Sequence, residues 1–375
     1  MDIEIRITRD LDSFLRLVDQ WNGMVAEKFD GHPFFSHFWF VNYYQSFFPG
    51  QSLYILTAHN GGKMVGALPM IICRRRLAGL PLKEVRLLAG EHSHVNQILV
   101  KSGDGKIVDL FFDSLLQEGV DLICLADIPA EFPLPFGVCD FCRSHRLLLE
   151  RKSVKASPFI RVEGSFEEYR KRLSKKFREL LNNRLNRIKR VGSFEIRSFT
   201  RPTDYELLLK DMQSISADSW QSQNNTGLYS TDDSSTFYRN LIQHSLENGY
   251  GEVSILYITD KPAAFEYHIF HGSTEYCLKV EFAQRFAKLS PGAVLDQKLV
   301  KRAFSTDIKV YDLLGFQSEY KARWTKDVRW QHRYYLFNRS LPAWAVYVIE
   351  HRLRNRLGKS KLLRRIRRLL KRNND

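Results

Sequence analysis

The stretch YCLKVEFAQRFAKLSPGAVLDQKLVKRAF, residues 276–304, decides the fold because its pattern changes twice. It opens as a strand, passes through the basic loop QRFAKLSPG, and continues as an amphipathic helix. The first turn of a helix presents backbone N–H groups without internal partners and a partial positive charge, and both attract anions such as phosphate. The stretch therefore predicts a strand that leads into a phosphate-binding helix N-terminus.

The composition describes a globular protein of more than one domain. With 375 residues the chain exceeds one ordinary core, so its length favours two domains. A hydrophobic fraction of 44% and an aromatic fraction of 13% exclude a disordered chain. The N-terminal MDIEIRITRD has no apolar signal region, and the apolar window LPAWAVYVI is too short to span a bilayer. We therefore predict a cytoplasmic protein.

The net charge of +15 is concentrated in two segments. Residues 351–375 contain eleven lysines and arginines and one aspartate. Residues 161–190 contain eleven lysines and arginines and four glutamates. Leucines and an isoleucine recur between the basic residues of the tail, a pattern typical of helices on anionic membrane surfaces. The tail predicts peripheral attachment to the inner face of the membrane, with docking on its own domain or a solvated tail as the alternatives.

The cysteines predict reduced thiols and no metal. Their number is odd and no secretion signal precedes them, which argues against disulfides. Cys139 and Cys142 form a CxxC pair, but a zinc site usually needs a second pair of ligands at similar spacing, and the sequence has none. The five cysteines are Cys73, Cys124, Cys139, Cys142 and Cys277.

Two segments of the chain resemble each other in outline. Asn60-Gly61 lies between apolar runs and predicts a β-hairpin, and residues 253–270 predict a second hairpin that can be laid over the first. An aromatic helix is expected over 32–48, and one long helix over 165–190. Ser165 and Glu168 would cap the long helix and Gly192 would stop it.

Three motifs carry a resemblance to a known family. They are the basic helix YRKRLSKKFRELLNNRLNRIKRVG, the strand followed by SPG-x-x-L, and the late segment YDLLGFQSEYKARW. In this order they resemble CelD/BcsL-type acetyltransferases of the GNAT superfamily, relatives of the FemAB-like tandem transferases. The resemblance implies an α/β (α+β) fold with two GNAT-like domains in tandem, mixed sheets flanked by helices, and a basic C-terminal amphipathic helix. The predicted domains are 1–155, an acyl-CoA-binding 156–340 and a tail 341–375.

The resemblance also implies acetyl-CoA or another acyl-CoA as cosubstrate, with its pyrophosphate on the loop and helix start of 285–293. Superfamily loops are often richer in glycine, whereas this loop has Gly292 alone. The alternative for Ser290 is an ordinary helix N-cap without a ligand. The cofactor-binding candidates are Arg285, Lys288, Ser290, Pro291, Gly292 and Ala293.

Acyl transfer to an amine needs a base for the amine and a proton for the leaving thiolate. Glu266 alternates with apolar neighbours along a strand, so one face would point it into a cleft. Asp312 lies in an apolar strand and could instead pair with Lys321 or Arg323 as a structural ion pair. The catalytic candidates are Glu281, Glu266, Asp312, Tyr320 and Lys321.

The substrate-binding candidates come chiefly from a polar loop between strands in the first half, because loops carry function disproportionately. They are His92, His94, Asn96 and, further along the chain, Trp220.

The predicted function is an acyl-CoA-dependent N- or O-acetyltransferase that acts on a sugar, nucleotide-sugar or polysaccharide precursor. The polysaccharide link comes from the resemblance alone. One rival is a FemAB-like transferase that takes an aminoacyl group from tRNA, and another is a catalytically degenerate scaffold at the membrane. The basic helix at 165–190 lacks the interleaved aromatic residues that stack on bases, which argues against nucleic acid as a partner.

Overall fold

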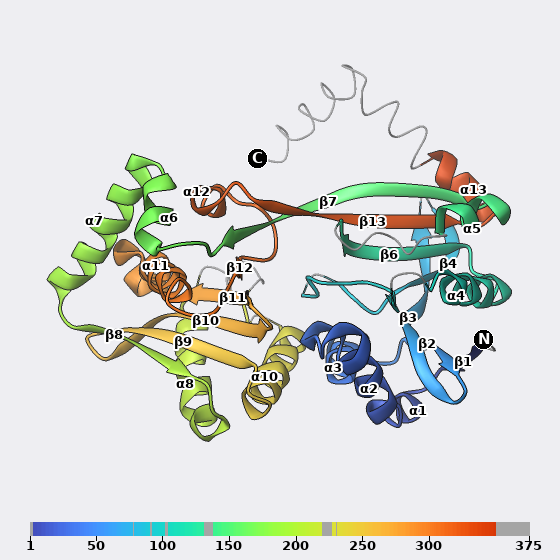
Figure 1. Ribbon diagram of the computed structural model, residues 1–375, viewed down its shortest axis with the longest axis horizontal. Helices are drawn as coiled ribbons and strands as arrows, with labels where there is room; N and C mark the ends of the chain where they lie inside the picture. Colours follow the sequence, from blue (N-terminus) through green and yellow to red (C-terminus); the bar gives the residue numbers. More distant parts are fainter. Residues whose placement is uncertain are drawn as a thin grey trace, which may run out of the picture. The chain divides into compact units, whose positions relative to one another are not determined.

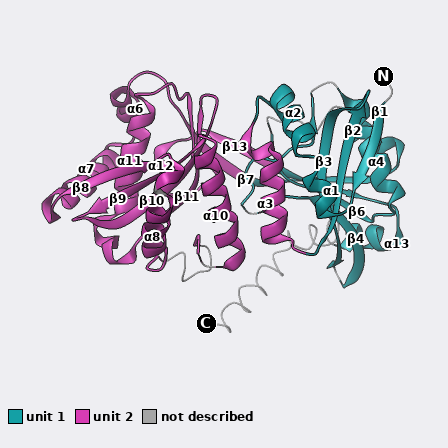
Figure 2. Cartoon of the chain, turned by 90° about the horizontal axis from the view of Figure 1, so that it is seen from below, with its two compact units in different colours: residues 1–31, 50–154, 332–375 teal, residues 32–49, 155–331 magenta. Residues whose placement is uncertain are grey.

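A computed structural model of the chain divides into two compact units, which Figure 2 distinguishes by colour. Unit 1 comprises 1–31, 50–154 and 332–375, and unit 2 comprises 32–49 and 155–331. The predicted domain limits stay a prediction, because compactness does not show which segments fold independently. The structure describes residues 3–77, 79–90, 92–101, 104–130, 138–219, 227–229 and 231–349.

Unit 1 is a mixed sheet with helices (Figure 1). Each of the strands β1 to β4 pairs antiparallel with the next one along the chain. Strand β6 pairs with β4 in parallel, and β13 follows β6 in the strand order. The short β5 pairs with β3. Its elements are β1 (Ile3–Thr8), α1 (Leu11–Leu15), α2 (Val18–Phe29), β2 (Ser52–Asn60), β3 (Lys63–Leu77), β4 (Leu80–Leu87), β5 (Leu99–Val100), α4 (Gly105–Gln117), β6 (Leu122–Pro129), α5 (Val138–Ser144) and α13 (Leu341–Val346), with parts of β7 (Leu148–Arg161) and β13 (Val328–Phe337).

Unit 2 repeats this arrangement. Strands β8 to β11 pair in sequence and antiparallel, β12 joins β11 in parallel, and β7 pairs with β12. Helices α7 and α11 lie on one face of this sheet, and α8 and α10 on the other. Its elements are η1 (Pro33–Phe35), α3 (His37–Phe47), α6 (Phe166–Arg172), α7 (Lys175–Val191), β8 (Phe194–Phe199), η2 (Pro202–Asp204), α8 (Tyr205–Ser216), α10 (Asp232–Glu247), β9 (Gly251–Ile258), β10 (Lys261–His271), β11 (Thr274–Phe282), η3 (Gln284–Leu289), α11 (Pro291–Ala303), β12 (Val310–Asp312) and α12 (Lys321–Trp324).

The repeated topology confirms the duplication expected from the sequence. In each unit a helix, α4 or α11, precedes a strand, β6 or β12, that pairs in parallel with the fourth antiparallel strand. Both predicted hairpins form, and each turns through two consecutive residues with positive φ, Gly61-Gly62 and Thr259-Asp260. Such turns match the twist of the flanking strands, so the two hairpins share one geometry despite different residues.

The single helix predicted over 165–190 is wrong in one respect, because the structure breaks it into α6 and α7. Leu173 is extended and buried, and the Ser174 hydroxyl accepts from the Phe177 N–H at 3.3 Å. A serine that caps the following turn competes with the helix that would run through it. The predicted capping box of Ser165 and Glu168 is confirmed, and α7 ends at Gly192.

The aromatic helix predicted over 32–48 is confirmed as η1 and α3, and it belongs to unit 2 although the chain on either side belongs to unit 1. The Asn42 amide donates to the Phe237 carbonyl at 2.9 Å, which fixes α3 to α10. Among the described residues no helix is both long and apolar enough to cross a membrane.

His32, just before η1, is buried among other rings. Its ring centroid lies 4.7 Å from that of Phe35 and 4.3 Å from that of His271, and its Nε2 lies 3.3 Å from the Tyr276 hydroxyl. Burial, with a smaller effect of His271, lowers the pKa of His32 to about 3. The folded protein therefore holds this imidazole neutral at pH values where an unfolded chain would protonate it.

We predict that His32 makes the fold sensitive to mild acid. Below pH 6.5 the unfolded chain binds a proton that folded His32 rejects until about pH 3, so stability falls as pH falls through this window. The substitution His32→Phe removes the ring that binds the proton. The free energy of unfolding should then depend on pH less steeply, by up to about 1.4 kcal/mol per pH unit. Urea denaturation from pH 7 to pH 5 measures it.

The exposed His145 gives the matched control for this measurement, as His145→Gln. Equal slopes for the wild type and His32→Phe would contradict the prediction, because they would show that folded His32 accepts its proton as readily as the unfolded chain does.

Candidate functional site

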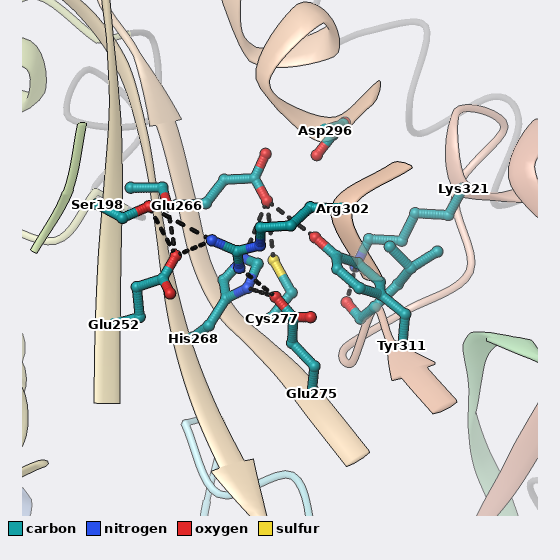
Figure 3. A network of polar contacts seen from close by, with 12 residues as sticks. Ser198, Glu252, Glu266, His268, Glu275, Cys277, Asp296, Arg302, Tyr311 and Lys321 are labelled. Carbon is teal, nitrogen blue, oxygen red and sulfur yellow. Dashed lines mark hydrogen bonds and ion pairs between the residues drawn. The ribbon is translucent and has the colours of Figure 1, made fainter. Parts of the chain in front are cut away.

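Unit 2 contains a row of polar side chains between its sheet and α11, drawn in Figure 3. Most of them are almost fully buried, which is unusual for charged groups. We call these residues the α11 cluster. They are Ser198, Glu252, Ser254, Glu266, His268, Glu275, Cys277, Asp296, Arg302 and Tyr311.

A bulge between β10 and β11 brings the cluster together. Tyr267 pairs with Lys279, whereas the next residue, His268, pairs with Cys277, so β11 holds one extra residue. Side chains alternate between faces along a strand, and the extra residue resets this alternation. Cys277 therefore shares a face with His268 and Glu266, and Lys279 faces the opposite way.

Glu281 lies beyond the bulge and faces α8. It is fully buried, it accepts hydrogen bonds from the Ser216 hydroxyl at 2.6 Å and from the Leu228 N–H, and Lys279 Nζ lies 3.7 Å away. Glu281 and Glu266, both predicted as catalytic, therefore lie on opposite faces of the sheet. The contacts of Glu281 give it the role of joining β11 to α8 and to the segment around Leu228.

His268 lies between two carboxylates. Its Nδ1 lies 2.5 Å from Glu275 Oε1, and its Nε2 lies 3.0 Å from Glu266 Oε2. Burial opposes a charge on the ring, but Cys277, Glu266 and Glu275 hold the pKa of His268 well above its usual range. Glu266 Oε2 also accepts from the Tyr311 hydroxyl at 3.2 Å. One oxygen of Glu266 is thus the centre of the cluster.

Arg302, on the last turn of α11, balances the remaining carboxylates. Its guanidinium donates to Glu252 and, at 3.0 Å, to Glu275, and the Ser254 hydroxyl donates to Glu252 at 2.7 Å. Buried carboxylates are tolerated when they are paired and hydrogen-bonded. Arg302 therefore allows α11 to pack on a charged face of the sheet.

Asp296, one helical turn and a half before Arg302, links the cluster to a predicted catalytic residue. The Tyr320 hydroxyl donates to its carboxyl group. Burial and the nearby Glu266 carboxylate raise the pKa of Asp296 well above its usual range, and burial and Asp296 raise the pKa of Tyr320. Two neighbouring carboxyl groups in a buried site share one proton more readily than they carry two charges.

Lys321 and Asp312 have backbone and side-chain partners of their own. Lys321 Nζ donates to the carbonyls of Leu313 and Leu314 at 2.9 and 2.8 Å, and burial lowers the pKa of Lys321. Asp312 accepts from the Arg329 guanidinium and from the Leu314 N–H at 2.9 Å. The alternative prediction that Asp312 forms a structural ion pair is correct, but its partner is Arg329 rather than Lys321 or Arg323.

The N-terminus of α11 is open. Pro291 is its first residue, and Ser290 takes a left-handed conformation, φ 54°, in which its side chain makes no capping hydrogen bond. The reading of Ser290 as an ordinary N-cap is therefore wrong. Among the described residues the N–H groups of Gly292 and Ala293 have no acceptor, whereas that of Val294 donates to the Ser290 carbonyl at 3.3 Å.

The basic residues of the loop differ in what they contact. The Arg285 guanidinium donates to Asp218 at 3.2 Å and to the carbonyls of Ser214 and Pro262, so it anchors the loop to α8 and β10. The Lys288 side chain is exposed, and its carbonyl accepts from Arg187 of α7 at 2.5 Å.

Arg184, one turn before Arg187, is a basic residue that the sequence does not single out within the charged helix. Its Nη1 atom is buried and has no acceptor among the described residues. Burial lowers the pKa of Arg184, and Tyr320 and Asp296 are among the groups close enough to affect it. Arg184 therefore carries a buried donor without an acceptor among the described residues, within electrostatic range of Tyr320 and Asp296.

Three of the four predicted substrate residues lie in the part of the chain that the structure describes. His92, His94 and Asn96 belong to unit 1, where the buried Asn96 amide donates to the Ser93 carbonyl at 3.1 Å and so holds its own loop. Trp220 lies outside the described residues. The cofactor and catalytic candidates lie in unit 2, and the structure brings Tyr320 and Lys321 next to α11 but separates Glu281 from them.

Sequence reasoning missed most of the α11 cluster, although a signal was present. Polar residues alternate with apolar ones at Glu266 and His268 and again at Glu275 and Cys277, within strands that are otherwise apolar. Period-two polar positions in two paired strands indicate a shared polar face. The bulge, however, cannot be located from this pattern.

The comparisons with known proteins agree with this fold. Residues 175–322 match the family described as "Acetyltransferase (GNAT) domain". A search of curated protein sequences finds no match.

Several solved structures resemble the whole chain. FemX aligns with a TM-score of 0.58 at 11% identity, over 93% of this chain and 99% of that chain. L-PGS from Bacillus licheniformis aligns with a TM-score of 0.54 at 12% identity, over 88% and 95%. A C-terminal domain assigned to a lysylphosphatidylglycerol synthetase from Agrobacterium fabrum aligns with a TM-score of 0.54 at 12% identity, over 89% of this chain and 95% of that chain.

At these identities the structural likenesses show a shared fold and nothing about substrates. The domain match covers the basic helix α7 and the strand, loop and start of α11, which carried the resemblance in the sequence, and it also covers the α11 cluster. The match supports the GNAT superfamily, and the protein is an acyltransferase.

Proposed function

We propose that the protein is an acyl-CoA-dependent N- or O-acetyltransferase of the CelD/BcsL type, and that the first turn of α11 binds the diphosphate of the acyl donor. One observation carries the proposal: at the helix start the N–H groups of Gly292 and Ala293 have no acceptor among the residues that the structure describes. Phosphate oxygens would accept from both groups, and the helix dipole favours their charge.

Neighbouring residues support a diphosphate at this place. Arg184 offers a guanidinium atom, Nη1, that has no acceptor in the part of the chain that the structure describes, and Arg187 donates to the Lys288 carbonyl. A Cβ atom built on Gly292 would lie 3.7 Å from Phe282, an ordinary contact, so the glycine is not required by packing inside the protein. We expect Arg285 to order the loop rather than to contact phosphate, because its guanidinium donates to three groups of α8 and β10.

Tyr320 is the residue that we propose as proton donor. The acceptor nitrogen or oxygen attacks the thioester carbon, and the C–S bond breaks. The leaving thiolate takes the proton of the Tyr320 hydroxyl. The proton that the acceptor loses then returns to Tyr320. A tyrosine hydroxyl carries its proton at neutral pH, burial and Asp296 raise the pKa of Tyr320 further, and the hydrogen bond to Asp296 orients the hydroxyl. Lys321, beside it, would orient the acceptor.

We further propose a sugar, nucleotide-sugar or polysaccharide precursor as acceptor and the inner face of the membrane as the place of work. The acceptor rests on the family resemblance, and the membrane contact rests on residues 351–375, which lie outside the described part of the chain. A second candidate is transfer from an aminoacyl-tRNA, favoured by the fold that the chain shares with FemX and with lysylphosphatidylglycerol synthetase structures.

We predict that acetyl-CoA stabilises the protein against heat. A ligand at about 100 times its dissociation constant adds roughly 2.7 kcal/mol to the free energy of unfolding. The substitution Ala293→Glu should abolish this gain, because its carboxylate repels phosphate while it interacts favourably with the helix N-terminus and leaves the free protein stable. Thermal denaturation with a panel of coenzyme A thioesters measures both effects.

Lys301→Ala is the matched control for Ala293→Glu. It changes the net charge by the same amount on the same helix, but at an exposed position of the last turn. Stabilisation that survives Ala293→Glu would place the donor elsewhere. If no thioester stabilises the wild type, the coenzyme A proposal fails and charged tRNA is the next ligand to test.

We predict that Tyr320→Phe lowers kcat/KM by about 10²- to 10⁴-fold, the usual loss when a positioned proton donor is removed. Stabilisation by acetyl-CoA should stay unchanged, since the phenyl ring keeps the packing of Tyr320. The rate of coenzyme A release with a panel of amino sugars and nucleotide sugars measures the loss. Tyr205→Phe, which removes a hydroxyl bonded to the Arg239 carbonyl, is the control. Equal rates for Tyr320→Phe and the wild type would remove Tyr320 from the mechanism.

A further inference from the structure

Three donor atoms of different chemistry converge at the bulge between β10 and β11. Glu266, His268 and Cys277 each offer one ligand atom, and these atoms lie within 4.8 Å of one another. The side chains come from both strands, and Figure 3 shows them directed toward a common point beneath α11. The three residues are 0%, 1% and 6% exposed.

The distances between these atoms suit a tetrahedral metal ion. Zinc lies about 2.0–2.1 Å from nitrogen and oxygen ligands and about 2.3 Å from sulfur, so the edges of its tetrahedron measure roughly 3.3–3.7 Å. In the structure His268 Nε2 lies 3.0 Å from Glu266 Oε2, and Cys277 Sγ lies 3.7 Å from the same oxygen. Two edges are thus close to the required length.

The surroundings of His268 match those of a metal-binding histidine. Such a histidine commonly donates its second ring N–H to a carboxylate, which fixes the tautomer and turns the other nitrogen toward the ion. Here Nδ1 lies 2.5 Å from Glu275, and Arg302 holds Glu275 at 3.0 Å. The carboxylate, the imidazole and the supporting guanidinium form a continuous chain.

The bulge is required for this arrangement. In a regular antiparallel pairing Leu278 would lie opposite His268, and Cys277 would turn to the other face, toward α8 and α10. Bulges re-aim side chains and are frequent next to functional sites. The one irregularity between β10 and β11 is the one that places a thiol beside Glu266 and His268.

We propose that Glu266, His268 and Cys277 bind a zinc-class divalent transition-metal ion. Thiolate and imidazole ligands favour such an ion over magnesium or calcium. The ion would replace the proton on His268 Nε2 and the thiol proton of Cys277, and both protons would pass to solvent. The fourth ligand would be a water molecule or the Tyr311 hydroxyl, which lies 3.2 Å from Glu266 Oε2. Because the ligands are buried, the ion would enter as the chain folds, and it would fasten β10 to β11 beneath α11.

Cobalt is the probe that tests this site, because a cobalt–thiolate bond absorbs in the near ultraviolet. The full chain is unfolded with chelator, refolded with cobalt(II), freed of unbound ion and analysed for metal content and absorption. We expect one ion per chain and a thiolate-to-cobalt band. The band should disappear in Cys277→Ser and persist in Cys139→Ser, which removes the exposed cysteine of the CxxC pair.

Three results would overturn the proposal. One is a refolded chain without cobalt, which would show that a proton on His268 alone bridges Glu266 and Glu275. Another is a band that persists in Cys277→Ser. The third is a band that disappears with Cys139→Ser. If Cys277→Ser fails to refold, Glu266→Gln decides the matter, because it keeps the thiol and the shape of the side chain and should still lower the metal content at least tenfold.

Discussion

One extra residue in β11 is the constraint on which unit 2 depends. The bulge at Tyr267 and His268 sets which side chains of β11 meet α11 and which meet α8. On the first face it joins Cys277 to Glu266 and His268, while Glu281, beyond the bulge, faces Ser216 of α8. Without the extra residue the two parts of β11 could not both keep these contacts, because one of them would turn its side chains to the opposite face.

The charged face created in this way determines how α11 can pack. A helix without Arg302 would leave Glu252 with hydroxyl donors alone and Glu275 with His268 alone, and removing one member of a buried charged pair costs up to about 3–5 kcal/mol. Arg302 at the end of α11 and Asp296 near its middle therefore fix the helix in position and rotation. Fixing the helix also fixes its first turn, where Ser290 leaves two N–H groups open. The buried network and the proposed phosphate site are thus two ends of one rigid element.

The sequence predicts local features of unit 2 far better than its long-range contacts. Hairpins, the capping box at Ser165 and the strand–loop–helix stretch depend on neighbouring residues, and all are found. The partner of Asp312 and the donor of Arg184 depend on which distant groups become buried together, whereas the break at Ser174 follows from a local cap that the helical pattern hides. Cys277 illustrates the limit most clearly. In the sequence Cys277 has no other cysteine nearby. The bulge places the imidazole of His268 and the carboxylate of Glu266 beside it, and no short-range pattern reveals the bulge.

The duplicated topology offers an internal comparison for the α11 cluster. In unit 1 the strands share one apolar core with the equivalent helix α4, to which they contribute Leu56, Leu68, Met70 and Val85. The same architecture therefore folds over an apolar core, and charge beneath this helix is not a demand of the fold. Replacing buried ionic groups by apolar ones is often neutral or stabilising. The strands of unit 2 carry carboxylates, a histidine and a thiol where those of unit 1 carry leucine, methionine and valine. The architecture does not require these polar groups, and the proposed metal site gives one chemical reason for their presence.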